Sequence, residues 1–176
     1  MAPGMKPVTA HLGLGSNLGQ REQNLAAALT ALAEHPQVTI TASSAIYETT
    51  PWGYADQPDF LNCVLAIATT LEPVALLELA KSIESKLGRQ AGPRFGPRLV
   101  DIDLLLYGDR IVASAVPDLR IPHPRLEQRA FVLVPLAELA GALEHPILRI
   151  SIAELLGRVP GREGVRFWGP PLRLAD

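Results

Sequence analysis

The chain is poor in cysteine, in long apolar runs and in excess charge. Its 176 residues include one cysteine, so no internal disulfide bond can form and a reducing compartment is compatible. No run approaches the roughly 18–20 consecutive apolar residues that a membrane-spanning helix needs. Residues 1–6 lack the apolar segment of a secretory signal peptide. We therefore expect a cytoplasmic protein without a membrane partner.

The charges nearly cancel, with 16 Lys and Arg against 18 Asp and Glu, for a formal net charge of -2. Nucleic-acid-binding proteins usually carry a basic excess, so we expect no nucleic-acid partner. What the chain does have is 48% hydrophobic residues and enough length for one sizeable core. We expect a single domain over residues 1–176, with its core at about 8–140 and a C-terminal extension at about 141–176.

The hydrophobic periods predict the order β-α-β-β-α-β. Strands are expected at 8–14, 38–47, 60–71 and 99–107, helices at 20–33 and 73–87, a rigid corner at 122–124, a helix at 129–139 and a short helical turn at 152–156. This order is typical of the α+β ferredoxin-like fold, an antiparallel sheet with two helices on one face. The loop at 48–59 is long for a connection between strands, and such loops are often functional. We assign no structure to the tail from Gly157.

The most informative segment is residues 86–103, in which a basic stretch is followed by two aspartates. Four positive charges and no acid lie between Lys86 and Arg98, and Asp101 and Asp103 follow. Residues two apart on a strand project to the same face, so the two carboxylates need compensation by arginines or by a divalent cation. Magnesium prefers one or two carboxylates together with phosphate oxygens. The pattern favours a metal and nucleotide site, with a salt-bridge cluster as the alternative.

Two glycine-rich segments invite a comparison with phosphate-binding loops. Arg89, Arg94 and Arg98 lie among glycines and prolines, and guanidinium groups suit phosphate oxygens. This segment is either a loop that closes over a ligand or a solvated surface loop. The segment 13–19 has neither the spacing and lysine of a phosphate loop nor the dinucleotide pattern, so we interpret it as a structural turn.

Aromatic and amide side chains suggest a second ligand. Trp52 lies in the long loop, and Phe60 and Asn62 share a face of the next strand. Aromatic walls with an amide at the base suit a flat heterocycle, although core packing and a turn role explain Phe60 and Asn62 equally well. His123, between two prolines, is expected to be fixed and exposed, as a phosphate contact or as an ordinary turn residue. Cys63 lies in an apolar run and is expected to be a packed thiol.

Together these motifs resemble the 6-hydroxymethyl-7,8-dihydropterin pyrophosphokinase family. The resemblance rests on residues 13–18, 47–53, 57–62, 84 with 88–89, 94–103, 122–123 and 129–131, above all on the pattern G-P-R-x-x-D-[IL]-D at 96–103. It implies transfer of a pyrophosphoryl group from Mg-ATP to the hydroxymethyl oxygen of the pterin, which leaves AMP, in folate biosynthesis. It also implies a monomer whose partners are these two small molecules.

The resemblance further implies roles for single residues. Asp101 and Asp103 would bind two Mg²⁺ ions, and Arg89 and Arg98 would join them in catalysis. The implied ATP contacts are Glu84, Arg89, Arg98, Leu104, His123 and Arg129. The implied pterin pocket consists of Thr49, Thr50, Trp52, Phe60, Asn62, Phe95 and Phe131, with Phe95 and Phe131 as its stacking pair. The chain departs from the family in Phe95 and Phe60, where some members have Trp and Tyr, in Pro124 after the histidine, and in a short segment between Arg89 and Arg94.

Two other functions use the same features. A ferredoxin-like RNA-binding module would have a basic surface and aromatic residues on its central strands, which the net charge opposes. A metal-dependent phosphohydrolase would use the two aspartates with water as the acceptor, which the pterin-like pocket opposes.

Overall fold

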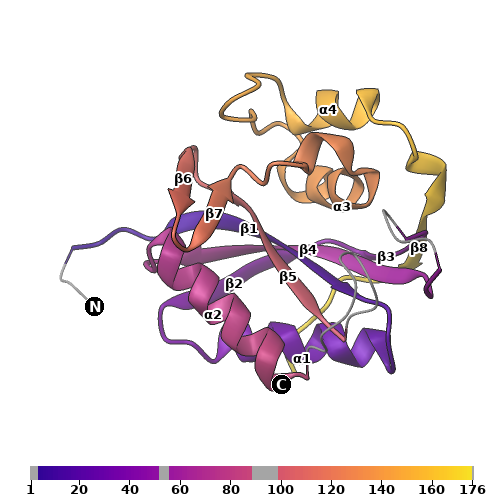
Figure 1. Cartoon of the computed structure of the whole chain (residues 1–176), viewed down its shortest axis with the longest axis horizontal. Coiled ribbons are helices and arrows are strands. Elements are labelled where there is room, and N and C mark those ends of the chain that lie inside the picture. Colours follow the sequence, from indigo (N-terminus) through magenta and orange to yellow (C-terminus); the bar gives the residue numbers. More distant parts are fainter. Residues whose placement is uncertain (1–3, 52–55, 89–98, 176) are drawn as a thin grey trace.

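A six-stranded antiparallel sheet organises the fold (Figure 1). The computed structural model describes residues 4–51, 56–88 and 99–175. The strand order is β5-β1-β4-β3-β8, and β2 also pairs with β4. The strands are β1 (Val8–Ser16), β2 (Val38–Ser43), β3 (Ile46–Thr49), β4 (Phe60–Thr69), β5 (Asp101–Tyr107) and β8 (Val165–Gly169), with a separate hairpin of β6 (Val112–Ala115) and β7 (Asp118–Ile121).

Within the described residues, four α-helices cover the two faces of the sheet. They are α1 (Arg21–Ala33), α2 (Pro73–Lys86), α3 (Ala130–Ala140) and α4 (Ile152–Arg158), and short 3-10 helices lie at Leu126–Gln128 and Arg162–Gly164. Helices α1 and α2 lie on one side of the sheet, and α3 and α4 lie on the other (Figure 1). The predicted βαββαβ order and ferredoxin-like α+β fold are confirmed by β1, α1, β2 with β3, β4, α2 and β5.

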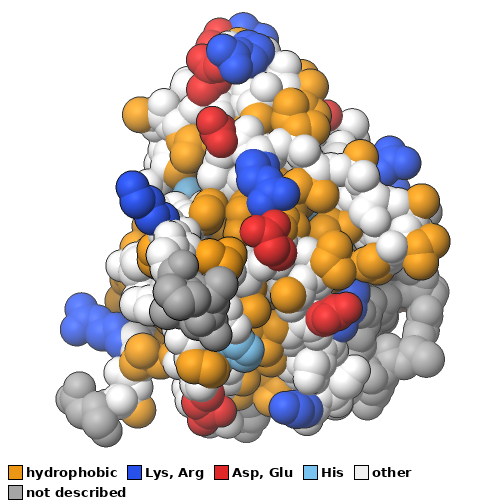
Figure 2. Space-filling view, turned by 90° about the vertical axis from the view of Figure 1, so that its left-hand side faces the viewer, with side chains coloured by type: hydrophobic (Ala, Val, Ile, Leu, Met, Phe, Trp, Pro, Cys, Tyr) orange, Lys and Arg blue, Asp and Glu red, His pale blue; other side chains and the backbone are white. Residues whose placement is uncertain are grey.

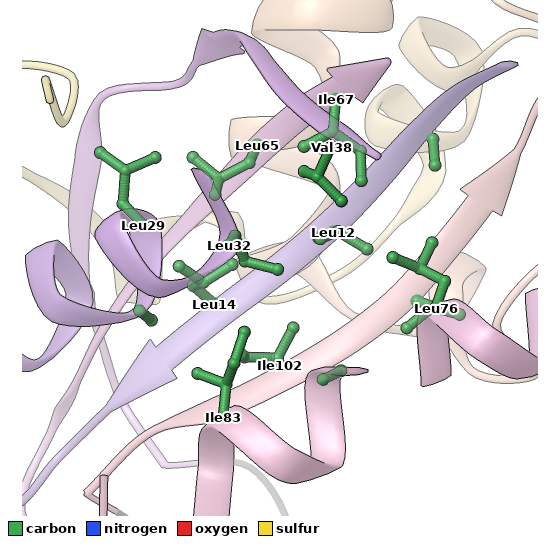
Figure 3. Packing of buried hydrophobic residues seen from close by; sticks show 14 of the residues in the cluster. Leu12, Leu14, Leu29, Leu32, Val38, Leu65, Ile67, Leu76, Ile83 and Ile102 are labelled. Atoms are coloured by element: carbon green, nitrogen blue, oxygen red, sulfur yellow. The ribbon is translucent and has the colours of Figure 1, made fainter. Parts of the chain in front are cut away.

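The main core lies between the sheet and the helices α1 and α2. Figure 3 shows Leu29 and Leu32 of α1 and Ile83 of α2 against Leu14 of β1 and Ile102 of β5. These side chains are almost completely buried. Because strand residues alternate between faces, the intervening positions of β1 and β5 face the other side, toward α3. Part of that second face packs on α3 and α4, and the rest lines the cavity described below.

The predicted strand at 38–47 is wrong in one respect, because it is divided into β2 and β3. At the division, the backbone N–H of Ser44 donates to the Val64 carbonyl at 2.8 Å, and the Ser44 hydroxyl accepts from the Val64 N–H at 2.9 Å. The N–H of Ala45 turns away from the sheet and donates to the Glu138 carboxylate on α3 at 3.1 Å. The Glu138 carboxylate therefore replaces a backbone hydrogen-bond acceptor at Ala45, and strand pairing resumes in β3.

The start of the chain also differs from the prediction. The expected turn at 13–19 is strand as far as Ser16, and the turn follows, with Gly19 at a φ of 65° that favours glycine. Asn17 does not cap α1. Its amide donates instead to Gln57 Oε1 at 2.8 Å and to the Pro58 carbonyl at 3.0 Å. The end of β1 is thereby joined to the connection between β3 and β4.

Three strands of the structure have no counterpart among the elements predicted from the sequence. The sequence does not predict the hairpin β6–β7 or strand β8, and β8 lies in the tail to which the sequence assigns no structure. Cys63 is buried in the core, which confirms the expectation of a packed thiol.

No helix among residues 4–51, 56–88 and 99–175 is long and apolar enough to cross a membrane. Among the described residues on the face shown in Figure 2, Lys and Arg are scattered among Asp and Glu and do not form one basic patch.

Candidate active site

A cavity of about 640 Å³ opens on the second face of the sheet, beside α3. Strands β1, β3, β4 and β5 form its floor, and the segment from β7 to α3 forms a wall. It brings together nine of the residues predicted from the sequence: Thr49, Thr50, Phe60, Asn62, Asp101, Asp103, His123, Arg129 and Phe131. These residues come from four separate parts of the chain, and the fold makes them neighbours.

The strand register aligns the polar groups of the floor. Gly15 of β1 pairs with Asp101 of β5 on one side and with Asn62 of β4 on the other. Directly opposed residues in an antiparallel sheet project to the same face. The Asp101 carboxylate and the Asn62 amide therefore rise from the same face two strand spacings apart, or about 10 Å. Between them Gly15 contributes only backbone, which leaves room above the floor.

Glycine at position 15 is required by the close approach of Asn62. A Cβ atom there would lie 2.7 Å from Asn62 Oδ1, and real Cβ atoms essentially never come so close. The amide of Asn62 is buried and donates through Nδ2 to Thr49 Oγ1 at 2.6 Å. The side chain is thus held in one orientation, as an amide that recognises a heterocycle must be.

Asp101 and Asp103 are both half-buried and line the cavity on the same face of β5. In the described part of the chain, no third His, Cys, Asp or Glu joins them to form a metal cage. Two carboxylates without a cage leave most coordination positions to phosphate oxygens and water, which is the arrangement that magnesium favours with nucleotides. The donor set therefore fits a Mg²⁺-nucleotide better than a structural metal.

His123 follows the corner after β7 and is half-buried, so the expectation that it is exposed is wrong. Its backbone N–H donates to the Leu105 carbonyl of β5 at 3.0 Å, and its Nδ1 accepts from the Arg125 N–H at 3.2 Å. Burial lowers the pKa of His123, and the nearby Asp103 carboxylate opposes this effect. In the neutral ring the hydrogen is therefore on Nε2, which is then a donor suited to a phosphate oxygen.

Arg129 and Phe131 lie at the beginning of α3. Arg129 is 7% exposed, and its guanidinium carbon lies 5.5 Å from the centre of the Phe131 ring. A guanidinium close to an aromatic ring in a partly dehydrated site is attracted to the ring and still carries full charge. Arg129 therefore adds a fixed cation to the wall near His123, whose pKa it helps to lower.

Glu84 and Leu104 do not line the cavity. Glu84 is 2% exposed on α2, where its Oε1 accepts from the Ile102 N–H at 2.9 Å. Leu104 is 6% exposed and packs in the main core. Because Ile102 lies between Asp101 and Asp103, this hydrogen bond to Glu84 holds the part of β5 that carries the two aspartates. The ATP contacts predicted for Glu84 and Leu104 stay predictions.

Several predicted residues lie outside the described parts of the chain. They are Trp52, Arg89, Arg94, Phe95 and Arg98. Their proposed roles stay predictions.

The cavity also contains residues that the sequence interpretation missed. Gly13 and Gly15 form its floor, and Lys81 of α2 and Asp118 of β7 lie in its lining. Alternate glycines inside a strand were a usable signal, because a glycine there often marks a close approach by another group. Lys81 and Asp118 gave no signal, since only the folded chain brings α2 and β7 to the same cavity.

Comparison with known proteins identifies the family. The family model for 7,8-dihydro-6-hydroxymethylpterin-pyrophosphokinase (HPPK) matches residues 11–141. A 2-amino-4-hydroxy-6-hydroxymethyldihydropteridine pyrophosphokinase of Bacillus subtilis (strain 168) is 43% identical over 159 residues, which cover 90% of this chain and 89% of the relative. A protein of the same name from Methylorubrum extorquens is 50% identical over 131 residues, which cover 74% of this chain and 82% of the relative.

Solved structures support the fold. A Plasmodium falciparum HPPK-DHPS variant crystallised with pterin and p-hydroxybenzoate matches with a TM-score of 0.72 at 15% identity, over 95% of this chain and 48% of that chain. The wild-type protein from the same organism matches with a TM-score of 0.69 at 16% identity, over 89% of this chain and 45% of that chain. The chain thus spans less than half the length of those proteins. With the family match over residues 11–141 and the two bacterial relatives, the chain belongs to the 7,8-dihydro-6-hydroxymethylpterin-pyrophosphokinase family.

Proposed function

We propose that this protein transfers the pyrophosphoryl group of Mg-ATP to the hydroxymethyl oxygen of 6-hydroxymethyl-7,8-dihydropterin, which gives the pterin diphosphate and AMP in folate biosynthesis. Family membership supports the reaction. The row Asp101–Gly15–Asn62 supports the division of the cavity into two halves. The amide end receives the pterin, and the carboxylate end receives the nucleotide phosphates.

The pterin half offers both shape and hydrogen-bonding groups. Phe60 and Phe131 supply flat apolar surface at the cavity wall, and a pterin ring is flat and aromatic. The Asn62 amide, oriented by Thr49, can accept from a ring N–H and donate to a ring acceptor. Leaving such a group unpaired is costly, so it selects for a heterocycle with a matching edge.

The phosphate half supplies charge. Asp101 and Asp103 would hold two Mg²⁺ ions, which supply positive charge that neutralises and aligns the phosphate oxygens when bound. His123 donates through Nε2, and Arg129 contributes a fixed cation in the same wall. Arg89 and Arg98 complete the proposed set of phosphate contacts.

The reaction requires alignment and charge neutralisation and no covalent intermediate. The buried Cys63 has accordingly no part in it, because burial raises the pKa of its thiol to about 12. We further propose that the active form is a monomer, as the family resemblance implies.

The test measures AMP released from Mg-ATP with and without the hydroxymethyl pterin. We expect AMP formation to require the pterin and to saturate with it. Equal AMP formation without the pterin would mean that water is the acceptor, as in a phosphohydrolase, and would refute the proposal.

A further inference from the structure

The C-terminal strand β8 lies beside the pterin half of the cavity. It pairs with β3 so that Val165 is opposite Thr49 and Arg166 is opposite Glu48. The Thr50 N–H donates to the Gly164 carbonyl at 3.3 Å. Because Thr49 and Thr50 line the cavity, β8 supports its wall from the outside. This strand is beyond residue 141, where the match to the family model ends.

Arg166 joins the two strand ends that carry cavity residues. Its Nη2 lies 3.3 Å from Glu48 Oε1 and 3.1 Å from Asp59 Oδ2. Glu48 immediately precedes Thr49 at the end of β3, and Asp59 immediately precedes Phe60 at the start of β4. The Arg166 guanidinium group thus links Glu48 and Asp59, which precede Thr49 and Phe60 of the cavity wall.

Arg21 reinforces the same bridge from the other side. Its Nη1 lies 2.9 Å from Glu48 Oε2 and donates to the Asp59 carbonyl at 2.9 Å. Its guanidinium carbon lies 5.0 Å from the centre of the Trp168 ring of β8. Hydrogen bonds first from Arg21 and then from Arg166 lower the pKa of Glu48, against the opposing effect of burial. Glu48 therefore stays ionised, and both of its oxygens have a partner.

Gly164 makes a second contact with the wall. A Cβ atom added there would lie 2.9 Å from Thr50 Oγ1, so no larger residue fits without moving this hydroxyl group. By contrast, a Cβ atom added at Gly169, at the other end of β8, would meet nothing within 4 Å. The close approach is therefore specific to the residue that precedes β8, beside Thr50 of the cavity wall.

We propose that the segment Gly164–Trp168 is a positioning element of the pterin site, in which Arg166 holds the strand ends next to Thr49 and Phe60, and Gly164 sets the position of Thr50. The proposal rests on the function proposed above. It predicts that the segment affects pterin binding specifically, because the contacts that it makes with Glu48, Asp59 and Thr50, within the described residues, are all beside the pterin half of the cavity.

The experiment compares Arg166→Gln and Gly164→Ala with two matched controls. Arg158→Gln removes a surface ion pair to Glu154, and Gly169→Ala adds a methyl group in open space. For each variant we would measure the KM for pterin, the KM for ATP, kcat and the dissociation constant of the pterin. We expect the KM and dissociation constant for pterin to rise roughly three- to tenfold in both test variants, on the scale of losing partly exposed ion pairs and wall geometry. The KM for ATP should stay near the wild-type value, and the controls should match the wild type.

The outcomes separate the two proposals. If wild-type protein forms AMP and the test variants bind pterin like the controls, the positioning role is overturned and the function stands. A parallel rise in the KM for both substrates also overturns the positioning role, since it indicates general destabilisation. Arg166→Lys keeps the charge and should restore part of the pterin affinity. A wild-type protein that forms no pterin-dependent AMP overturns both proposals.

Discussion

Gly15 is the position at which a single methyl group tests the proposed pterin site. In Gly15→Ala, the new Cβ atom would lie 2.7 Å from Asn62 Oδ1, well inside the 3.4–4 Å of ordinary contact. The Phe60 ring would lie 3.5 Å from the new Cβ atom, which is an ordinary contact. The Asn62 amide is therefore the group that must move. Its bond of 2.6 Å to Thr49 Oγ1 would then be lost or distorted.

The size of the effect follows from the burial of Asn62, which is 8% exposed. Misplacing a buried amide costs about 1–3 kcal/mol, because its hydrogen bonds to Thr49 and to the pterin edge are no longer made together. This cost corresponds to pterin binding that is weaker by about 5- to 150-fold. The affinity for Mg-ATP should change little, since Asn62 is on the opposite side of Gly15 from Asp101.

The assay is a direct titration of the pterin, followed by its fluorescence or by calorimetry, with Gly13→Ala as the control. Gly13 is two residues earlier on the same strand, and a Cβ atom there would make an ordinary contact of 3.5 Å with Leu105. We expect Gly13→Ala to bind pterin far better than Gly15→Ala. If a folded Gly15→Ala protein binds pterin as well as the wild type, the assignment of Asn62 to the pterin is refuted.

Three further predictions concern the proposed metal ligands, a buried histidine and the thiol. Asp101→Asn or Asp103→Asn should lower the rate of AMP formation by about 10²–10³, the scale of losing one electrostatic stabiliser, and near-normal turnover in a folded variant would remove the metal-ligand role. Burial lowers the pKa of His11 from 6.5, so the unfolded chain binds the proton first as the pH falls. The free energy of unfolding should therefore decrease below about pH 6.5, and a denaturant titration of His11→Leu that shows the full wild-type decrease would contradict this. Because burial raises the pKa of Cys63 to about 12, a thiol reagent should modify the folded protein only as fast as it unfolds, and rapid modification would contradict the packing.

The sequence predicted the helices and strands that are determined by a local pattern of residues. The helical period of α1 and the apolar run of β4 are visible in short windows, and the structure follows them closely. The break at Ser44 was hidden because its cause is a hydrogen bond to Val64, twenty residues away. Strand β8 was hidden for the same reason, since it exists through its pairing with β3, more than a hundred residues earlier.

For the site, the sequence indicated which residue types matter but not how they are arranged. The two-residue spacing of Asp101 and Asp103 was sufficient to place them on one face. The relation between Asp101 and Asn62 depends on the registers of two strand pairs, which no local pattern contains. Gly15 looked like a turn residue, and the alternate glycines at 13 and 15 could signal a close approach but not that Asn62 is the group that makes it.

The most direct test of the central claim is the identity of the products. Wild-type protein would be incubated with Mg-ATP and 6-hydroxymethyl-7,8-dihydropterin, and both products would be resolved by mass spectrometry and phosphorus NMR. The account predicts AMP and the pterin diphosphate in equal amounts, because the whole pyrophosphoryl group is transferred. ADP with a pterin monophosphate, or AMP with free pyrophosphate and unchanged pterin, would contradict it.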